Sequence, residues 1–452
     1  MRTNLSQVFQ LALGPMLFLL CMALPVSSEK AWVLGTALWM ISWWITESLP
    51  MGATALLPLL LLSLSGVLDA QQLASAYAHP LIFLFMGGFF LARGLEHHQL
   101  HRKLAQFVLK SLGHHPRHAL AGTMLVTWGL SMWMSNTATA VMMLPLTLSM
   151  VRNLESSPRL ERRMLLGLAW AANLGGMATL IGTPPNALFA AFHLDMTGNS
   201  ISFGHWFATA APISAVLLII AYGILQRGLR EDTFDDWRPE AIPWTRASRW
   251  VAGIFSLTVI AWMTRPIVGE WLNLTGYSDT WIALCSAMLL FTLRNPDNLK
   301  EALLPWSSAK HIEWGILLLF GGGLALAVGL KVSGWLDLAQ GAGSGLPVWM
   351  WILVATACGV WLTEFFSNMA LVSALLPVVW IVAQREGIDF ETLAIPLTLG
   401  ASSAFMLPIA TPPNAIVFST GQLKVRHMMQ MGFWMNTAAT IVITLLCGLM
   451  LA

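Results

Sequence analysis

The sequence is short of charge and short of any surface that would attract nucleic acid. Only 10% of its 452 residues are charged while 56% are hydrophobic, so most of the chain cannot be solvated as a water-soluble globule is. The formal net charge of +2 is spread over short loops and forms no basic face, which excludes nucleic acid as an expected partner. These shortages predict a chain whose solvent is a lipid bilayer.

Residue patterns typical of disulfides, metal sites and catalytic centres are scarce as well. The four cysteines all lie in apolar runs without a CxxC pair, so neither a disulfide framework nor a thiolate metal site is expected. No HExxH or GxSxG pattern occurs, and a membrane-embedded enzyme would need such a set. Six histidines are clustered without acidic or cysteine ligands: His97, His98, His101, His114, His115 and His118. We expect an interfacial loop helix there, and no enzyme.

Long apolar runs are what the sequence has in abundance. They recur along the whole chain at roughly 15 to 25 residues, the length that crosses about 30 Å of hydrocarbon. The sequence therefore predicts an all-α polytopic membrane protein. The eleven expected spans lie near 11–27, 31–48, 51–66, 79–93, 163–192, 205–227, 249–264, 279–293, 311–330, 392–420 and 428–452.

The chain contains an internal repeat. Ser135-Asn136-Thr137 corresponds to Ser367-Asn368-Met369 at an offset of 232 residues, and TPPNA at 183–187 returns at 411–415. FMGGFFLA from Phe85 has a counterpart in FGGGLALA from Phe320, where the glycines are expected to permit close helix packing. Two halves therefore share one design.

Loop charges predict that the second half is threaded the opposite way. In the first half, stretches 63–79, 93–117, 152–163 and 192–206 hold none, five, four and no Lys or Arg. The matching stretches 294–310, 331–347, 383–391 and 421–430 hold three, one, one and two. Loops rich in Lys and Arg stay in the cytoplasm, and in the two halves such loops occupy opposite positions. This indicates an inverted-topology repeat, with the amino terminus in the cytoplasm.

The same counts predict two re-entrant hairpins. The stretch 117–152 has basic loops at both ends and would enter from the cytoplasm. The stretch 347–384 has loops with few Lys or Arg residues at both ends and would enter from outside. The expected organisation is N-terminal scaffold helices at 1–50, a first repeat at 51–229, a cytoplasmic linker at 230–248 and a second repeat at 249–452.

Each TPPN motif should interrupt a span. Proline removes a backbone donor and clashes with the preceding turn, so Thr183 or Thr411 would be the N-cap of a new half-helix that begins at Pro184 or Pro412. One such motif alone would be read as a packing kink. Two motifs in register with two SN turns would direct four half-helix N-termini toward one point at mid-depth, which attracts an anion without a buried arginine.

The hairpin tips predict sites for a weakly bound hard cation. Ser131 and Ser135 are four residues apart, hence expected on one helix face, and Asn136 adds an amide oxygen beside the carbonyl of Gly182. Thr363, Ser367, Asn368 and Ala410 repeat the pattern in the second half. Neutral oxygens of this kind suit sodium, whereas a divalent cation usually draws carboxylates. Glu364 is a further buried candidate, for either a functional role or a structural one.

The motifs SNTATAVMMLP, GTPPNA, TEFFSN and ATPPNA resemble the divalent anion/sodium symporter family, of the bacterial sodium-dicarboxylate symporter type, through nearly the whole chain. The resemblance implies a homodimer in the bacterial inner membrane that moves its substrate by an elevator-like shift of a transport domain. It implies at least two sodium ions, one at Ser131, Ser135, Asn136 and Gly182, the other at Thr363, Phe366, Asn368 and Ala410. Substrate carboxylates would meet Asn136, Thr137, Thr183, Asn368 and Thr411, with Pro184 and Pro412 at the border of the site.

The chain departs from the family pattern at Met369, where relatives usually carry a third hydroxyl residue. We expect this side chain to remove a donor and add bulk beside the anion. The predicted function is sodium-coupled symport of a C4-dicarboxylate such as succinate. Sodium-independent dicarboxylate exchange, and sodium-coupled transport of sulfate or another anion, stay open as alternatives.

Overall fold

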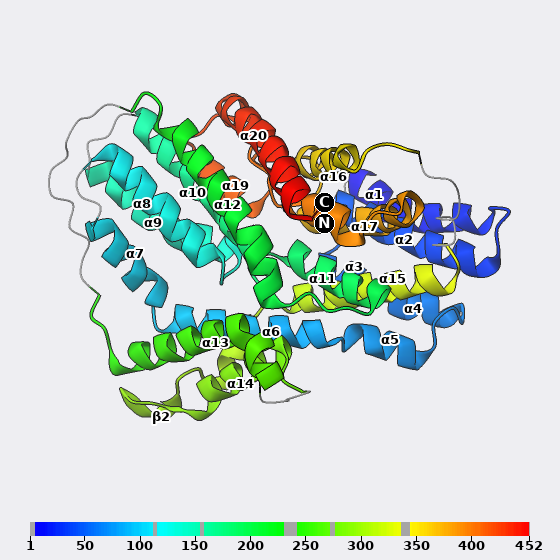
Figure 1. The fold of residues 1–452 in the computed structure, drawn as a ribbon, viewed down its shortest axis with the longest axis horizontal. Coiled ribbons are helices and arrows are strands. Elements are labelled where there is room, and N and C mark those ends of the chain that lie inside the picture. The colour runs from blue at the N-terminus through cyan, green and yellow to red at the C-terminus, as the bar shows by residue number, and fades with distance from the viewer. Residues whose placement is uncertain are drawn as a thin grey trace.

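The computed structural model describes residues 5–111, 115–153, 158–229, 242–271, 276–335 and 344–451, and these are almost entirely helical (Figure 1). Among these described residues, six helices are long and apolar enough to cross a membrane, and further apolar helices are shorter. The predicted all-α polytopic fold is confirmed. Most of the predicted linker, 230–248, lies outside the described residues, as does His114.

The first half runs from α1 to α12. Its helices are α1 Leu5–Met22, α2 Ser28–Thr46, α3 Met51–Thr54, α4 Leu57–Leu64, α5 Ala70–Tyr77, α6 Pro80–His97, α7 Leu100–Ser111, α8 Pro116–Ser131, α9 Asn136–Asn153, α10 Pro158–Ala178, α11 Pro184–Thr197 and α12 Phe203–Gln226. The predicted span at 51–66 is thus two short helices, and α7 is the loop helix expected near the histidines.

The second half adds a small strand pair that the sequence did not predict. Its elements are α13 Arg246–Trp271, α14 Asp279–Thr292, β1 Arg294–Asn295, β2 Asn298–Ala302, η1 Trp306–His311, α15 Trp314–Val332, α16 Val348–Leu362, α17 Asn368–Glu386, α18 Phe390–Ala401, α19 Pro412–Phe418 and α20 Val425–Leu451. Strands β1 and β2 pair antiparallel at the end of α14.

Short polar residues start several of these helices. Asp69 and Gln72 form a reciprocal capping box at α5, with the Asp69 carboxylate accepting from the Gln72 amide N–H at 2.7 Å. Ser202 caps α12 by accepting from the amide N–H of His205 at 3.0 Å. Gly198 ends α11 in the left-handed region, at φ 76°, where a side chain would be strained. The helix boundaries are therefore written locally in the sequence.

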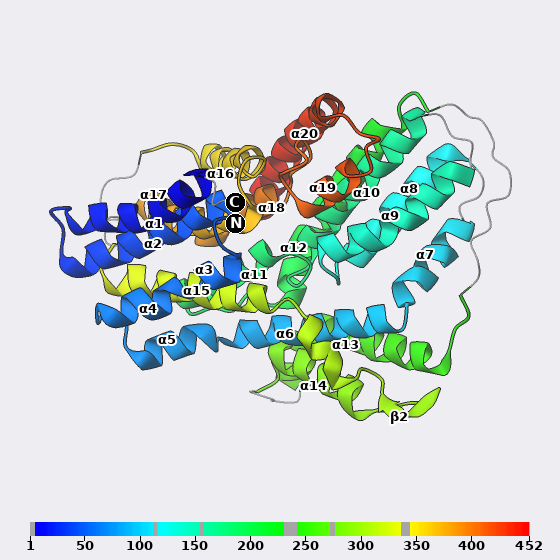
Figure 2. The same cartoon turned by 180° about the vertical axis from the view of Figure 1, so that it is seen from behind.

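The repeat is visible in the order of the elements. The series α8 to α12 matches α16 to α20, a hairpin, an interrupted helix and a long helix in each half. The two hairpins lie toward opposite ends of the longest axis, α8–α9 on the left of Figure 1 and α16–α17 on the right, and the reverse view in Figure 2 agrees. This is the arrangement that an inverted repeat predicts.

Two groups of helices build the molecule. Helices α8–α12 pack with α16–α20, while α2–α6 pack with α13–α15, and α11 with α15 and α17 with α2 are among the contacts that join the groups. The expected glycine packing is confirmed: a Cβ on Gly87 would lie 2.7 Å from the Cβ of Ala283, and one on Gly321 would overlap the ring of Tyr77. The absence of a side chain therefore lets α6 approach α14 at Gly87 and lets the Tyr77 ring of α5 lie against α15 at Gly321.

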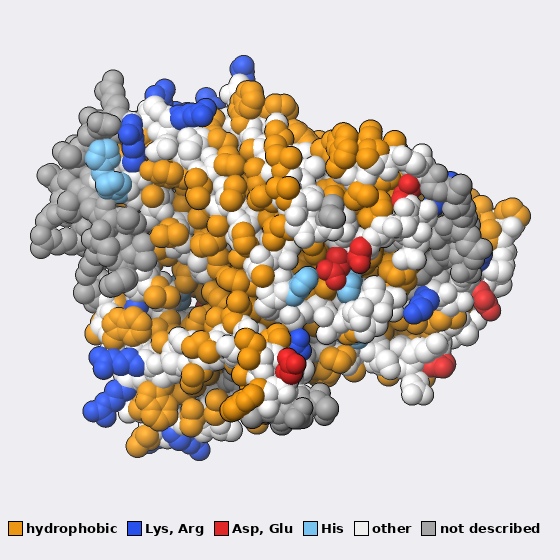
Figure 3. Space-filling model, in the orientation of Figure 1, with side chains coloured by type: hydrophobic (Ala, Val, Ile, Leu, Met, Phe, Trp, Pro, Cys, Tyr) orange, Lys and Arg blue, Asp and Glu red, His pale blue; other side chains and the backbone are white. Residues whose placement is uncertain are grey.

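The surface suits a bilayer. Hydrophobic side chains cover most of the face in Figure 3, and Lys and Arg gather mainly at its left end, where Figure 1 places α7 and the outer ends of α8–α10. That end carries the basic loops that the charge counts assign to the cytoplasm.

Candidate functional site

The tip of the first hairpin gathers oxygen atoms. Helix α8 ends at Ser131 and α9 begins at Asn136. The buried hydroxyl oxygen of Ser131 lies 2.8 Å from Oδ1 of Asn136 and 2.7 Å from the carbonyl oxygen of Ala172 in α10. One hydroxyl proton therefore faces two acceptors, and an oxygen-rich, proton-poor cluster of this kind suits a hard cation.

Gly182 brings the first helix break against this tip. A Cβ on Gly182 would lie 2.5 Å from the carbonyl oxygen of Gly176 and 3.0 Å from that of Ser131. The Asn136 amide in turn lies against Gly176, where a Cβ would meet its nitrogen at 2.8 Å. The structure thus brings Ser131, Asn136 and Gly182 together as the sequence predicts, because neither glycine position leaves room for a side chain.

The predicted shared helix face of Ser131 and Ser135 is wrong. The helix ends at Ser131, and residues 132–134 form a turn before α9. The half-buried Ser135 hydroxyl instead accepts from the amide N–H of Ala138 at 3.2 Å and so caps α9. Its link to the oxygen cluster rests on its place beside Asn136 in the chain.

The second hairpin repeats the first cluster. The buried Thr363 hydroxyl lies 2.7 Å from Oδ1 of Asn368 and 2.8 Å from the carbonyl oxygen of Ala401 in α18. Ser367 caps α17 by accepting from the amide N–H of Ala370 at 3.2 Å. Phe366 lies in the turn between the arms. Two halves with few identical residues have thus built the same hydroxyl, amide and carbonyl triad.

Both TPPN motifs interrupt their helices as predicted. Helices α11 and α19 begin at Pro184 and Pro412, with Thr183 and Thr411 at the N-cap positions. Neither threonine hydroxyl makes the expected cap hydrogen bond. Because prolines occupy the first helical positions and carry no N–H, the donors at these breaks are the threonine hydroxyls rather than a full turn of backbone amides.

The asparagine of each TPPN motif closes its own break. The Asn186 side-chain nitrogen donates to the carbonyl oxygens of Gly176, Met177 and Thr179, at 3.1, 3.3 and 2.7 Å. These carbonyls have lost their helical partners at the end of α10, so the amide replaces the missing backbone donors. This role was not predicted, although the recurrence of Asn in both motifs signals it.

Asn414 does the same in the second half. Its nitrogen donates to the carbonyl oxygens of Ala404 and Leu407, at 3.2 and 3.0 Å. The break here is longer, since α18 ends at Ala401 and α19 starts only at Pro412. Ala410 lies at its far end, next to Thr411, so its place in the second cation site rests on chain position.

Glu364 holds this longer break open. Its carboxylate is buried, and it accepts from the backbone N–H groups of Phe405, Met406 and Leu407 at 2.8, 2.9 and 2.9 Å. The Asn436 side-chain nitrogen in α20 supplies a fourth donor at 2.9 Å. Of the two roles left open for Glu364, the geometry favours the structural one, because four donors satisfy the carboxylate.

Two residues of the first half also reach the second break. The Asn173 side-chain nitrogen donates to the carbonyl oxygen of Ala404 at 2.9 Å and to the Thr411 hydroxyl at 3.1 Å. The Trp170 indole N–H donates to the carbonyl oxygen of Phe405 at 3.2 Å. Helix α10 thus ties both breaks into one unit, a connection between distant segments that sequence patterns do not reveal.

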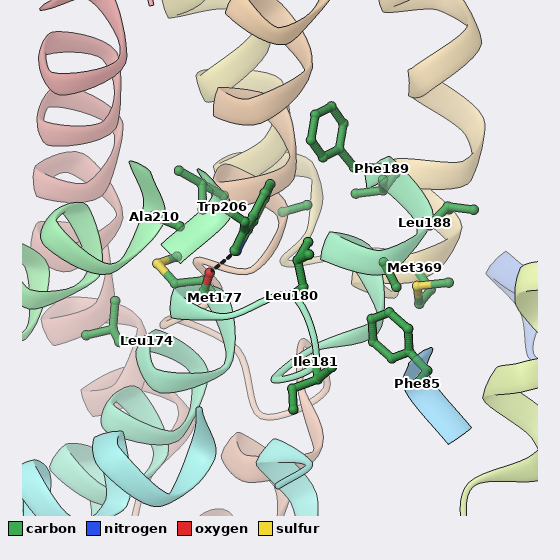
Figure 4. Close-up of a cluster of buried hydrophobic side chains, with 14 of the residues drawn as sticks. Phe85, Leu174, Met177, Leu180, Ile181, Leu188, Phe189, Trp206, Ala210 and Met369 are labelled. Atoms are coloured by element: carbon green, nitrogen blue, oxygen red, sulfur yellow. Dashed lines mark hydrogen bonds between the residues drawn. The ribbon is translucent and has the colours of Figure 1, made fainter. Parts of the chain in front are cut away.

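The two SN motifs differ in exposure at their third residue. Thr137 is exposed at the start of α9, whereas Met369 is 6% exposed and belongs to the buried hydrophobic cluster, where Figure 4 places it near Phe85 and Leu188. Met369 therefore lies among apolar side chains, and its place beside the anion stays a prediction.

The half-helix N-termini lie near one another. Helix α19 packs against α9, and α11 packs against α17, so each broken helix starts beside the second arm of a hairpin. A cleft of about 420 Å³ lies beside the start of α9; Ala138, Val141 and Met142 of α9 form one wall, and Glu96 and Arg102 are on the other. Because Ala138 follows Thr137 directly, a solute in this cleft comes within one residue of the SN motif.

Comparison with known proteins gives this arrangement its context. The family model described as "Citrate transporter" matches residues 41–400. The chain is similar to a sodium-dependent dicarboxylate transporter, SdcS, of Staphylococcus saprophyticus, at 34% identity covering 98% of this chain and 91% of that protein. It is also similar to SdcS of Staphylococcus aureus, at 34% identity covering 97% and 90%.

Two solved structures share the fold. The YdaH transporter of Alcanivorax borkumensis superposes with a TM-score of 0.58 at 15% identity, covering 85% of this chain and 89% of that one. MtrF of Neisseria gonorrhoeae, from a class of antimetabolite efflux pumps, superposes with a TM-score of 0.56 at 10% identity, covering 83% and 82%. At these identities the likeness describes architecture alone.

Proposed function

Because the chain belongs to the citrate transporter family, as one of its divalent anion/sodium symporters, we propose that it carries a C4-dicarboxylate such as succinate into the cell together with sodium. It is a multi-pass membrane transporter and not an enzyme. The proposal concerns the substrate, the coupling ion and the movement.

The observation that carries the proposal is the pair of matching oxygen clusters. Ser131 with Asn136, and Thr363 with Asn368, have the same bonds at the same spacing in two halves of different sequence. Hydroxyl, amide and carbonyl oxygens without a carboxylate match the preferences of sodium. Two clusters support at least two sodium ions per chain, with Gly182 completing the first site, and Phe366 and Ala410 the second.

The anion would be held between the clusters by neutral donors. Asn136 and Thr137 from one half, Asn368 from the other, and the hydroxyls of Thr183 and Thr411 would surround the anion near the starts of the half-helices. Helices α9, α11 and α17 each direct a positive dipole end there. No Lys or Arg occurs in 118–151 or 348–384, so sodium bound beside the site would supply the countercharge for the two carboxylates.

We further propose that α8–α12 and α16–α20 move as one body against the remaining helices, in a homodimer of the bacterial inner membrane with a cytoplasmic amino terminus. The two helix groups and their few shared contacts support a rigid-body movement. The cleft beside α9 is lined by Arg102 of the basic stretch 93–117, which fits a cytoplasm-facing state of such a carrier.

Purified protein in proteoliposomes tests the function. An inward sodium gradient should drive saturable uptake of labelled succinate that stops when sodium is replaced by potassium. The double variant Asn136→Ala with Asn368→Ala should abolish uptake, because it removes an amide oxygen from each cluster. Uptake that persists in the double variant, or without sodium, would contradict symport.

The same vesicles separate the alternatives. A sodium-independent exchanger would need succinate inside the vesicle rather than a sodium gradient. A carrier of sulfate would take up labelled sulfate and ignore succinate.

A further inference from the structure

A second cavity lies between the first hairpin and α13, and it shares His101 with the cleft beside α9. Its volume is about 380 Å³, and its walls are almost entirely apolar. Leu104 of α7, Leu125 of α8 and Trp244 stand at its mouth with exposed fractions of 45, 47 and 45%. Apolar side chains left open in this way inside a bilayer protein call for an apolar occupant.

The dimensions of the cavity match one lipid leaflet. Trp244 precedes α13, and Trp residues gather where the membrane meets water. The inner end is closed by Trp133 of the hairpin turn against Phe255 of α13, with ring centroids 5.0 Å apart. At 1.5 Å per helical residue, Phe255 lies about 14 Å beyond the start of α13, about half of the hydrocarbon thickness.

The mouth carries positive charge. The Lys103 ammonium lies 5.6 Å from the centroid of the Trp244 ring, and Lys103 is only 5% exposed. Arg102, its neighbour in the chain, lines the cleft beside α9 instead. The acidic group that faces Lys103 is Asp297, whose carboxylate is already engaged as acceptor of the Ala247 amide N–H at 2.9 Å. The Lys103 ammonium therefore supplies the positive charge at this mouth.

A polar group without a partner points to a ligand as well. His101 lines the cavity and is 6% exposed, and its Nδ1 has no hydrogen-bond partner among the described residues. Burial, and then the nearby Arg102, lowers the pKa of His101 to about 4, so the imidazole is neutral at physiological pH. A neutral His101 imidazole in the cavity wall is compatible with the ester group of a lipid acyl chain beside it.

We propose that this cavity binds an anionic phospholipid: one acyl chain fills the space between α8 and α13, and the phosphate lies beside Lys103. Apolar walls recognise the chain, and the cationic mouth on the side of the basic loops recognises the negative headgroup. Because one wall is the hairpin that carries Ser131 and Asn136, the bound lipid separates this hairpin from α13 in the present conformation.

Two glycines make a matched test. Gly129 lines the cavity, and no heavy atom lies within 4 Å of a Cβ built on it, so the side chain of Gly129→Leu starts in open space and should occupy the cavity. Gly253 on α13 is equally free, is exposed, and is not part of the cavity wall, so Gly253→Leu is the control with the same gain in helix propensity.

Full-length protein reconstituted with equal phosphatidylglycerol and phosphatidylcholine would be analysed by native mass spectrometry. Wild type and Gly253→Leu should retain one more phosphatidylglycerol per chain than Gly129→Leu, and Lys103→Gln should lose the preference for phosphatidylglycerol. An equal lipid count in Gly129→Leu would overturn the site, and equal retention of phosphatidylcholine by wild type would overturn the anionic headgroup.

A measurement on wild type alone covers the case in which Gly129→Leu does not fold. Phosphatidylglycerol with a photoreactive acyl end should crosslink to peptides that contain residues 125–134 and 252–256. Crosslinks confined to other lipid-facing helices, such as α1 or α20, would overturn the proposal.

Discussion

Replacing Glu364 tests whether its carboxylate holds the second helix break, between α18 and α19, in place. Oε1 accepts three of the four hydrogen bonds and Oε2 accepts the fourth, from Leu407. Glu364→Gln can keep the three bonds at its amide oxygen, but its NH2 group then faces the Leu407 N–H. One unmet donor costs about 1–3 kcal/mol, which is a change of roughly 5-fold to 160-fold in an equilibrium constant.

Glu364→Ala should be much more severe. It leaves four donors unmet in a buried space, and at the lower bound of about 1 kcal/mol each, with water entering the vacated volume, the loss is about 4 kcal/mol. We expect Glu364→Gln to raise the half-saturating sodium concentration by about tenfold, since the break carries Ala410 and Thr411. Glu364→Ala should abolish uptake and lower the thermal denaturation midpoint in detergent.

The assay is sodium-dependent succinate uptake in proteoliposomes, paired with thermal denaturation followed by size-exclusion chromatography. Glu301→Gln, on the exposed strand β2, is the control for loss of one carboxylate. If Glu364→Gln matched wild type in both sodium dependence and denaturation midpoint, the carboxylate would not be holding the break, and the structural role assigned to it would be wrong.

Three further outcomes are expected. Asn186→Ala should lower the denaturation midpoint more than Asn414→Ala, because it removes three hydrogen bonds to carbonyl oxygens rather than two; the reverse order in thermal denaturation would contradict this. Thr363→Val should raise the half-saturating sodium concentration roughly tenfold while Thr363→Ser leaves it near wild type, and equal values in uptake assays would remove the hydroxyl from the ion site. Met369→Thr should lower the denaturation midpoint and change succinate affinity less than twofold, since the side chain is buried in the apolar cluster; a large gain in affinity would place it at the anion instead.

The breaks at TPPN could be predicted because proline acts locally. A missing N–H and a clash with the preceding turn depend on nothing outside the motif, and both half-helices begin at the predicted proline. The length of the second break could not be predicted in this way. It depends on Glu364, about forty residues upstream, and on Asn173 of the other half.

The site was predicted in outline and wrong in one detail. Counting four residues from Ser131 to Ser135 assumes that the helix continues, but the helix ends at Ser131 so that its hydroxyl can reach Ala172. Likewise the position of Met369 beside Asn368 gave no sign that its side chain packs near Phe85 of α6 and Leu188 of α11, because such contacts are decided by tertiary packing.

The two breaks differ in which parts of the chain supply their hydrogen-bond partners, and this has a consequence for biosynthesis. The side chains that bond around the first break, those of Thr179, Asn186 and Trp206, all lie within the first 229 residues. The second break also needs Trp170 and Asn173, which leave the ribosome more than two hundred residues earlier. The first interrupted helix can therefore form before the second half has been synthesised. The second break then forms against α10 of the folded first half.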